Sequence, residues 1–164
     1  MSTIQIGVDL AKTVFEVALS EAPGVVTSRR RLSRSAFPRF LAAQPPAEVL
    51  LEACGSAHHW GRVFAARGHA VRLMAAEFVV PLRQGGKNDG NDALAIAIAA
   101  RQPTMRFVPV KTVEQQAILA WHRMRQGWIE ERTALLNRVR GLLAEFGLVP
   151  GRSPAVLIAA MARI

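Results

Sequence analysis

The sequence predicts an α/β fold, in which helices flank a mixed five-stranded sheet and a long helical, coiled-coil-like arm follows. Short runs rich in branched residues come first in succession and then alternate with helical segments. This order is typical of a mixed sheet with helices on its faces. From Thr112 to Phe146 an uninterrupted helical pattern replaces the alternation and predicts the arm.

The first three predicted strands follow one another closely. Ile4–Asp9 and Val14–Leu19 are joined by the short connection Lys12–Thr13, which favours a hairpin. A turn at Ala22–Gly24 then leads into a third strand over Val25–Leu32, whose end is basic.

Helices and strands alternate after the third strand. Ser35 is expected to cap a short helix through Leu41, and Ser56 opens a helix that closes at Gly68. The other elements are a fourth strand over Val49–Glu52, a fifth over Val71–Met74 and a third helix over Asp89–Arg101. The resulting strand order is that of the ribonuclease H topology.

The predicted arm carries a heptad seam, because residues recur along it at alternating steps of three and four. Trp121 and Trp128 can stack on bases, but their seam positions favour a core or an interface. We therefore expect a homodimer or higher oligomer through this helix, with parallel and antiparallel pairing both open. The seam comprises Ile118, Trp121, Arg125, Trp128, Arg132, Leu135, Val139, Leu142 and Phe146.

Length and composition narrow the class of protein. A chain of 164 residues that is 51% hydrophobic can bury one proper core. We expect a catalytic domain over residues 1–108, the arm over 109–150, and the start of a truncated carboxy-terminal domain over 151–164. No secretory signal is evident, and no apolar run reaches the ~18 residues of a membrane span. These features favour a cytoplasmic protein without a membrane partner, and the family resemblance described below implies a bacterial, nucleoid-associated one.

The charge favours a nucleic-acid partner. The net charge is +9 and comes mainly from arginine, whose guanidinium matches phosphate geometry. A genome that prefers arginine codons is the alternative explanation. The residues expected to bind nucleic acid are Lys12, Arg29, Arg30, Arg31, Arg34, Lys87, Arg123, Arg125, Arg138 and Arg140. The single cysteine, Cys54, excludes an internal disulfide, and its apolar neighbours predict that it packs inside.

The acidic residues give the sharpest functional signal. The chain has only three aspartates: Asp9 at the end of the first strand, and Asp89 and Asp92 at the start of the third helix. Glu52 ends the fourth strand. Clustered carboxylates supply the hard oxygen ligands that Mg²⁺ or Mn²⁺ prefers, and two such ions about 3.5–4 Å apart support phosphoryl displacement. Taken singly, Asp89 is equally well explained as a helix cap, Asp92 as a first-turn acid and Glu52 as an exposed strand-end acid.

Four segments resemble the amino-terminal half of transposases of the insertion sequence 110 family. They are Ile6–Lys12 (IGVDLAK), Leu51–Gly55 (LEACG), Lys87–Ala93 (KNDGNDA) and Asn137–Gly147 (NRVRGLLAEFG). The resemblance implies a RuvC-like catalytic domain whose DEDD tetrad corresponds to Asp9, Glu52, Asp89 and Asp92. It also implies metal-dependent phosphoryl transfer on DNA, a longer protein with a serine-bearing second domain, and association with a structured guide RNA.

Two other functions remain open from the sequence. The chain can be a module that binds a guide RNA or a DNA junction, with a tetrad that is idle without the second domain. An actin-like or sugar-kinase-like ATPase begins with a similar strand and hairpin, but it needs a second glycine-rich phosphate loop, which the sequence does not contain.

Overall fold

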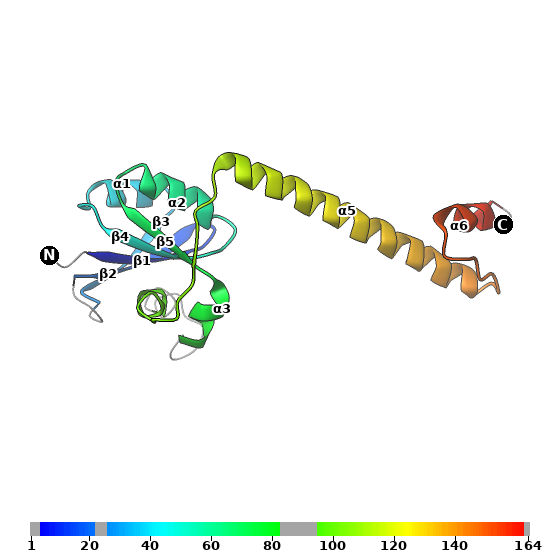
Figure 1. The fold of residues 1–164 in the computed structure, drawn as a ribbon, viewed down its shortest axis with the longest axis horizontal. Helices are drawn as coiled ribbons and strands as arrows, with labels where there is room; N and C mark the ends of the chain where they lie inside the picture. The colour runs from blue at the N-terminus through cyan, green and yellow to red at the C-terminus, as the bar shows by residue number, and fades with distance from the viewer. Residues whose placement is uncertain (1–3, 22–25, 83–94, 163–164) are drawn as a thin grey trace. The chain divides into compact units, whose positions relative to one another are not determined.

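The computed structural model describes residues 4–21, 26–82 and 95–162 (Figure 1). The chain divides into two compact units, Met1–Thr112 and Val113–Ile164, each of which is treated by itself below. Among the described residues, no helix is both long enough and apolar enough to cross a membrane.

The first unit is built on a mixed six-stranded sheet in the order β3-β2-β1-β4-β5-β6. β1 pairs antiparallel with β2 and parallel with β4, as the hairpin and the following crossover predict. The mixed sheet is therefore confirmed, and its order is consistent with a ribonuclease H-like fold. The strands are β1 (Gln5–Leu10), β2 (Val14–Ser20), β3 (Ser28–Ser33), β4 (Glu48–Glu52), β5 (Ala70–Met74) and β6 (Phe107–Val108).

Helices lie on both faces of the sheet (Figure 1). α1 (Phe37–Ala42) and α2 (Ala57–Ala65) cover one face, which we call the aromatic face. The opposite face, which we call the carboxylate face, is covered by α3 (Ala76–Val79) and by the helical residues 95–99. A short 3-10 turn, η1 (Val80–Leu82), follows α3.

The core under the aromatic face is held by four rings. Phe15 of β2 meets Phe37 and Trp60 edge-on, with ring centroids 4.8 and 5.1 Å apart. Phe37 also meets Phe64 edge-on at 5.5 Å. Edge-to-face pairs add roughly 0.5–1.5 kcal/mol each to the burial of the rings. These contacts fix α1 and α2 against the strands that carry the candidate site.

A smaller core lies under the carboxylate face. Leu50 of β4, Met74 of β5 and Val79 of α3 are fully buried there against the helical residues Ala95, Ile96 and Ala99. The sheet is thus buried on both sides, which explains why β4 reads as a continuous apolar run rather than an alternating one.

Several details differ from the sequence prediction. The sheet has six strands rather than five, because the two residues of β6 extend it beyond β5. α1 begins after Ala36 rather than Ser35, and no side chain caps it. Ser56 does occupy the cap position of α2, but its hydroxyl makes no capping hydrogen bond. The third strand begins at Ser28, three residues later than predicted.

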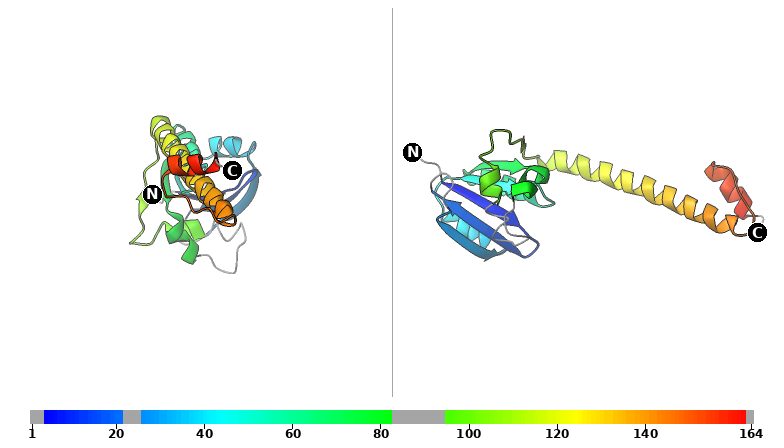
Figure 2. Two further views of the ribbon diagram at one scale, coloured as in Figure 1. Left: turned by 90° about the vertical axis from the view of Figure 1, so that its right-hand side faces the viewer. Right: turned by 90° about the horizontal axis from the view of Figure 1, so that it is seen from below.

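The second unit consists of two helices. α5 (Val113–Ala144) is one continuous helix, which confirms the predicted long helix, and α6 (Pro154–Met161) lies beside its carboxyl-terminal end (Figure 2). Leu143 and Leu157 are the buried side chains of these helices. The seam tryptophans are exposed, Trp121 by 66% and Trp128 by 57%.

Candidate functional site

Asp9 and Glu52 lie at the same end of two neighbouring strands. The parallel pairing of β1 and β4 matches Gln5 with Glu48 and continues to Val8 with Leu51. Asp9 and Glu52 are the next residues on the two strands, so the register brings them side by side at the carboxyl ends.

The two carboxylates share one face of the sheet. Val8 and Leu51 are fully buried in the core of the aromatic face. Successive side chains of a strand point to opposite faces, so Asp9 and Glu52 belong to the carboxylate face, with Leu50. Both acids are partly buried. They therefore lie on the face against which residues 95–99 pack.

Sequence reasoning missed a third acid in this row. Glu16 of β2 is the antiparallel partner of Asp9. Like charges directly opposite each other destabilise a strand pair. Arg31 of β3 offsets the charge of Glu16 through an ion pair of 3.3 Å. The alternation of strand residues was the available signal, because Glu16 falls between buried residues of β2.

The other two predicted carboxylates, Asp89 and Asp92, lie outside the described residues, as does Lys87. Within the described residues, no three side chains of histidine, cysteine, aspartate or glutamate come together as metal ligands. Ala95 packs in the core of the carboxylate face.

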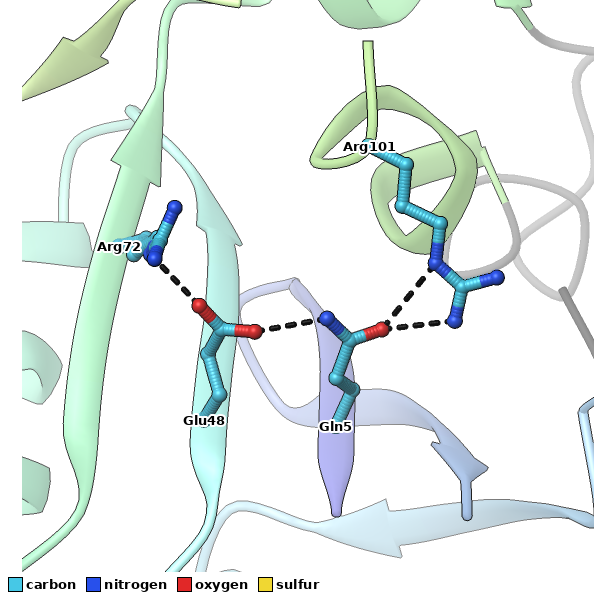
Figure 3. Close-up of polar contacts among 4 residues, drawn as sticks. All are labelled: Gln5, Glu48, Arg72 and Arg101. Carbon is cyan, nitrogen blue, oxygen red and sulfur yellow. Dashed lines mark hydrogen bonds and ion pairs between the residues drawn. The ribbon is translucent and has the colours of Figure 1, made fainter. Parts of the chain in front are cut away.

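A chain of polar contacts crosses the carboxylate face at the amino ends of the strands (Figure 3). Arg72 of β5 pairs with Glu48 at 2.5 Å, and Gln5 donates to the other oxygen of Glu48 at 2.7 Å. Arg101 donates to Gln5 Oε1 at 2.8 and 3.3 Å, and to Ser20 Oγ at 3.3 Å. Arg101 is two residues beyond the helical segment, so these contacts tie the segment to β1, the strand that carries Asp9.

A pocket of about 300 Å³ lies at the carboxyl ends of β1 and β4. The loop after β1 contributes Lys12, the loop after β4 contributes Ser56, and Arg34 follows β3. The remaining lining residues are Leu10, Ala11, Cys54 and Gly55. Cys54 is exposed, which corrects the expectation that it packs inside, because the β4 strand ends before it.

The predicted basic cluster after the hairpin is divided between different environments. Arg29, Arg30 and Arg31 are exposed on β3. The Arg30 guanidinium lies over the ring of Phe40, 5.5 Å from its centroid. Arg31 is engaged with Glu16, and Arg34 lies in the pocket. Binding of nucleic acid by these four arginines stays a prediction.

The predicted basic residues of the arm all lie on α5. Arg123, Arg125 and Arg138 are exposed. Arg140 instead donates to Asn137 Oδ1 at 3.0 Å and to the backbone oxygen of Arg152, so it also ties α5 to the loop before α6.

Comparison with known proteins identifies the family. The family model for DEDD transposases of the IS110 group, described as "Transposase", matches residues 6–147. The chain belongs to the IS110 transposase family. The match begins within β1 and reaches the end of α5, so it includes all four candidate carboxylates.

Several curated relatives are similar over nearly the whole chain. A probable family 20 transposase of Pseudomonas aeruginosa is 49% identical over 93% of the chain and 45% of its own length. The transposase for insertion sequence element IS1111A of Coxiella burnetii is 43% identical over 90% of the chain and 40% of its length. The transposase for IS1328 of Yersinia enterocolitica is 40% identical over 93% and 46%, respectively. The chain thus spans less than half the length of these relatives.

Proposed function

We propose that this IS110-family chain is the catalytic half of a transposase that transfers phosphoryl groups on DNA with the help of divalent metal ions. The observation that carries the proposal is the adjacent placement of Asp9 and Glu52 on parallel strands of a mixed sheet. Two carboxylates brought to one strand end, in a chain of this family, are suited to holding a metal ion against a phosphate.

The proposed metal ligands are Asp9, Glu52, Asp89 and Asp92. Their donors are hard carboxylate oxygens, which fit Mg²⁺ or Mn²⁺ and not a softer metal. When bound, two such ions supply charge stabilisation to the attacking and leaving oxygens of a phosphoryl displacement. Asp89 and Asp92 lie outside the described residues, and the match to the DEDD family model supports including them in the proposed set.

The chain's own residues bind and orient the nucleic acid in this proposal. Exposed arginines of β3 and α5 would contact phosphates of DNA, and a structured guide RNA presents the same chemistry. The second candidate function is binding of such a nucleic acid without independent catalysis. Its support is the set of exposed arginines on β3 and α5, which can contact phosphates without a metal ion.

Metal-dependent thermal unfolding tests the proposed site. We expect Mn²⁺ at about 100 times its Kd to raise the Tm of the 164-residue chain by roughly 5–10 °C, because an ion bound only to the folded state stabilises it. The variants Asp9→Asn and Glu52→Gln should lose this rise. Glu77→Gln, which neutralises an exposed acid on α3, is the matched control and should keep it.

The outcomes separate the two functions. A wild-type Tm that ignores Mn²⁺, or a rise that survives in Asp9→Asn, would contradict the metal site. A normal metal response without cleavage or joining of DNA strands would favour the binding module.

A further inference from the structure

We propose that the pocket of Lys12, Arg34 and Ser56 binds a backbone phosphodiester of the nucleic-acid strand, next to the phosphate that the carboxylates act on. The second half of this statement rests on the function proposed above, whereas binding in the pocket does not. Lys12 and Arg34 make one wall of the pocket positively charged, and the Ser56 hydroxyl adds a polar donor. The pocket is formed by the loops that follow the strands ending near Asp9 and Glu52.

Arg34 is positioned by contacts with neutral groups, which leave its positive charge without an anionic partner in these contacts. Its guanidinium lies over the rings of Phe15 and Trp60, 5.7 and 5.6 Å from their centroids. Nη1 also donates to the backbone oxygen of Lys12 at 3.3 Å. A guanidinium fixed in this way loses little conformational freedom when it binds an anion.

The two cations of the pocket lack anionic partners among the described residues. Arg31 and Arg72 each form an ion pair with a glutamate, but neither Lys12 nor Arg34 does within the part of the chain described. Two neighbouring cations that form no ion pair with any described residue favour an external anion. The Arg34 guanidinium and the Lys12 ammonium can both donate hydrogen bonds to the oxygens of a phosphodiester.

The rest of the pocket suits an oxyanion of this size. The Ser56 hydroxyl makes no capping bond to α2, so it is available as a further donor. The remaining walls are small or apolar, and a Cβ added at Gly55 would meet no heavy atom within 4 Å. The backbone of a polymer strand can therefore approach this wall closely.

The position of the pocket indicates which phosphate it takes. Leu10 follows Asp9 directly, and Cys54 is two residues beyond Glu52. Two residues of chain span at most about 7 Å, so the pocket begins within one or two residues of both acids. Asp9 and Glu52 belong to the carboxylate face, whereas Arg34 lies over Phe15 and Trp60 of the aromatic face. A nucleic-acid strand that contacts both would therefore cross the carboxyl ends of β1 and β4.

Cys54 offers a direct test, because it lines the pocket, is exposed and is the only cysteine of the chain. The experiment measures the rate at which N-ethylmaleimide alkylates the 164-residue chain in EDTA at low salt, with and without a single-stranded 20-nucleotide DNA. At a DNA concentration about ten times its Kd we expect the rate to fall roughly tenfold.

Variants of the pocket residues test whether DNA protects Cys54 from alkylation by binding in the pocket. The double variant Lys12→Gln, Arg34→Gln should lose most of the protection, and Lys12→Gln alone should weaken it several-fold while sparing the ring contacts of Arg34. The matched control is Arg39→Gln, Arg67→Gln, which removes the same charge from exposed positions outside the pocket and should keep the protection.

Further measurements distinguish a phosphate of a nucleic-acid strand from free inorganic phosphate or a mononucleotide. We expect inorganic phosphate and a mononucleotide at the same concentration to protect far less than the DNA, because they lack the contacts of the adjoining strand. Protection by these small anions but not by DNA would overturn the proposal, as would equal protection in the wild type and the double variant. Repeating the experiment with Asp9→Asn keeps this test separate from that of the metal site, since EDTA and the substitution both remove metal binding.

Discussion

Gln5 shows how one uncharged side chain links two distant arginines. Its amide nitrogen donates to Glu48 and its oxygen accepts from Arg101, a residue 96 positions away in the sequence. Glu48 is in turn paired with Arg72. These linked, partly buried contacts fix the segment after residues 95–99 against β1 and β4.

Removing the Arg101 guanidinium from this network of polar contacts should destabilise the first unit. We expect Arg101→Gln to lower the free energy of unfolding by roughly 1–3 kcal/mol, because Gln5 Oε1 and Ser20 Oγ lose a charged donor. Urea unfolding followed by tryptophan fluorescence measures this effect, since Trp60 is buried and Trp121 and Trp128 are exposed.

Arg106→Gln is the control for that experiment, because Arg106 is exposed and close in sequence. An equal loss of stability in the two variants would mean that the general loss of charge, and not the Arg101 contacts, is responsible.

At the scale of elements, Gly127 lowers the stability of the helix α5. Gly127 lies in the interior of this helix, and an added Cβ would meet no heavy atom within 4 Å. We therefore expect Gly127→Ala to stabilise the helix by about 0.5–1 kcal/mol and to raise its Tm, followed by circular dichroism at 222 nm.

Gly61 of α2 provides the contrast. An added Cβ there would lie 3.1 Å from both Cγ atoms of Val110, so Gly61→Ala should gain less than Gly127→Ala or destabilise the protein. A larger gain at Gly61 than at Gly127 would contradict this interpretation.

The elements that could be predicted are those with a strong local pattern. Five strands and the long helix are evident because branched residues or a sustained helical period define them. β6 has two residues and α3 has four, too few to display any period.

Asp9 and Glu52 could be proposed from their strand-end positions, whereas Arg101, Gln5 and Glu48 meet only through tertiary structure. Ser35 failed as a cap because the helix begins one residue later, at a position without a capping side chain.

At the scale of the whole molecule, the exposed seam of α5 remains the basis for predicting a homodimer. Trp121, Trp128, Leu135 and Leu142 are each more than half exposed along one heptad seam. We expect the wild-type chain to sediment as a dimer or higher oligomer at micromolar concentration, and Trp128→Glu, Leu135→Glu to sediment as a monomer.

Ala120→Glu, Ala134→Glu is the matched control, because it adds the same charges to α5 at exposed positions away from the seam. The prediction is wrong if the wild type is a monomer, or if both double variants dissociate equally.

The two outer strands of the sheet have a consequence for the protein's behaviour at high concentration. A sheet margin with unpaired backbone groups can recruit a strand from another molecule and begin aggregation. Three consecutive exposed arginines line β3, so two such margins would repel each other. β6 at the opposite margin is only two residues long and offers little template. The free protein is therefore guarded against uncontrolled strand addition at both margins of the sheet.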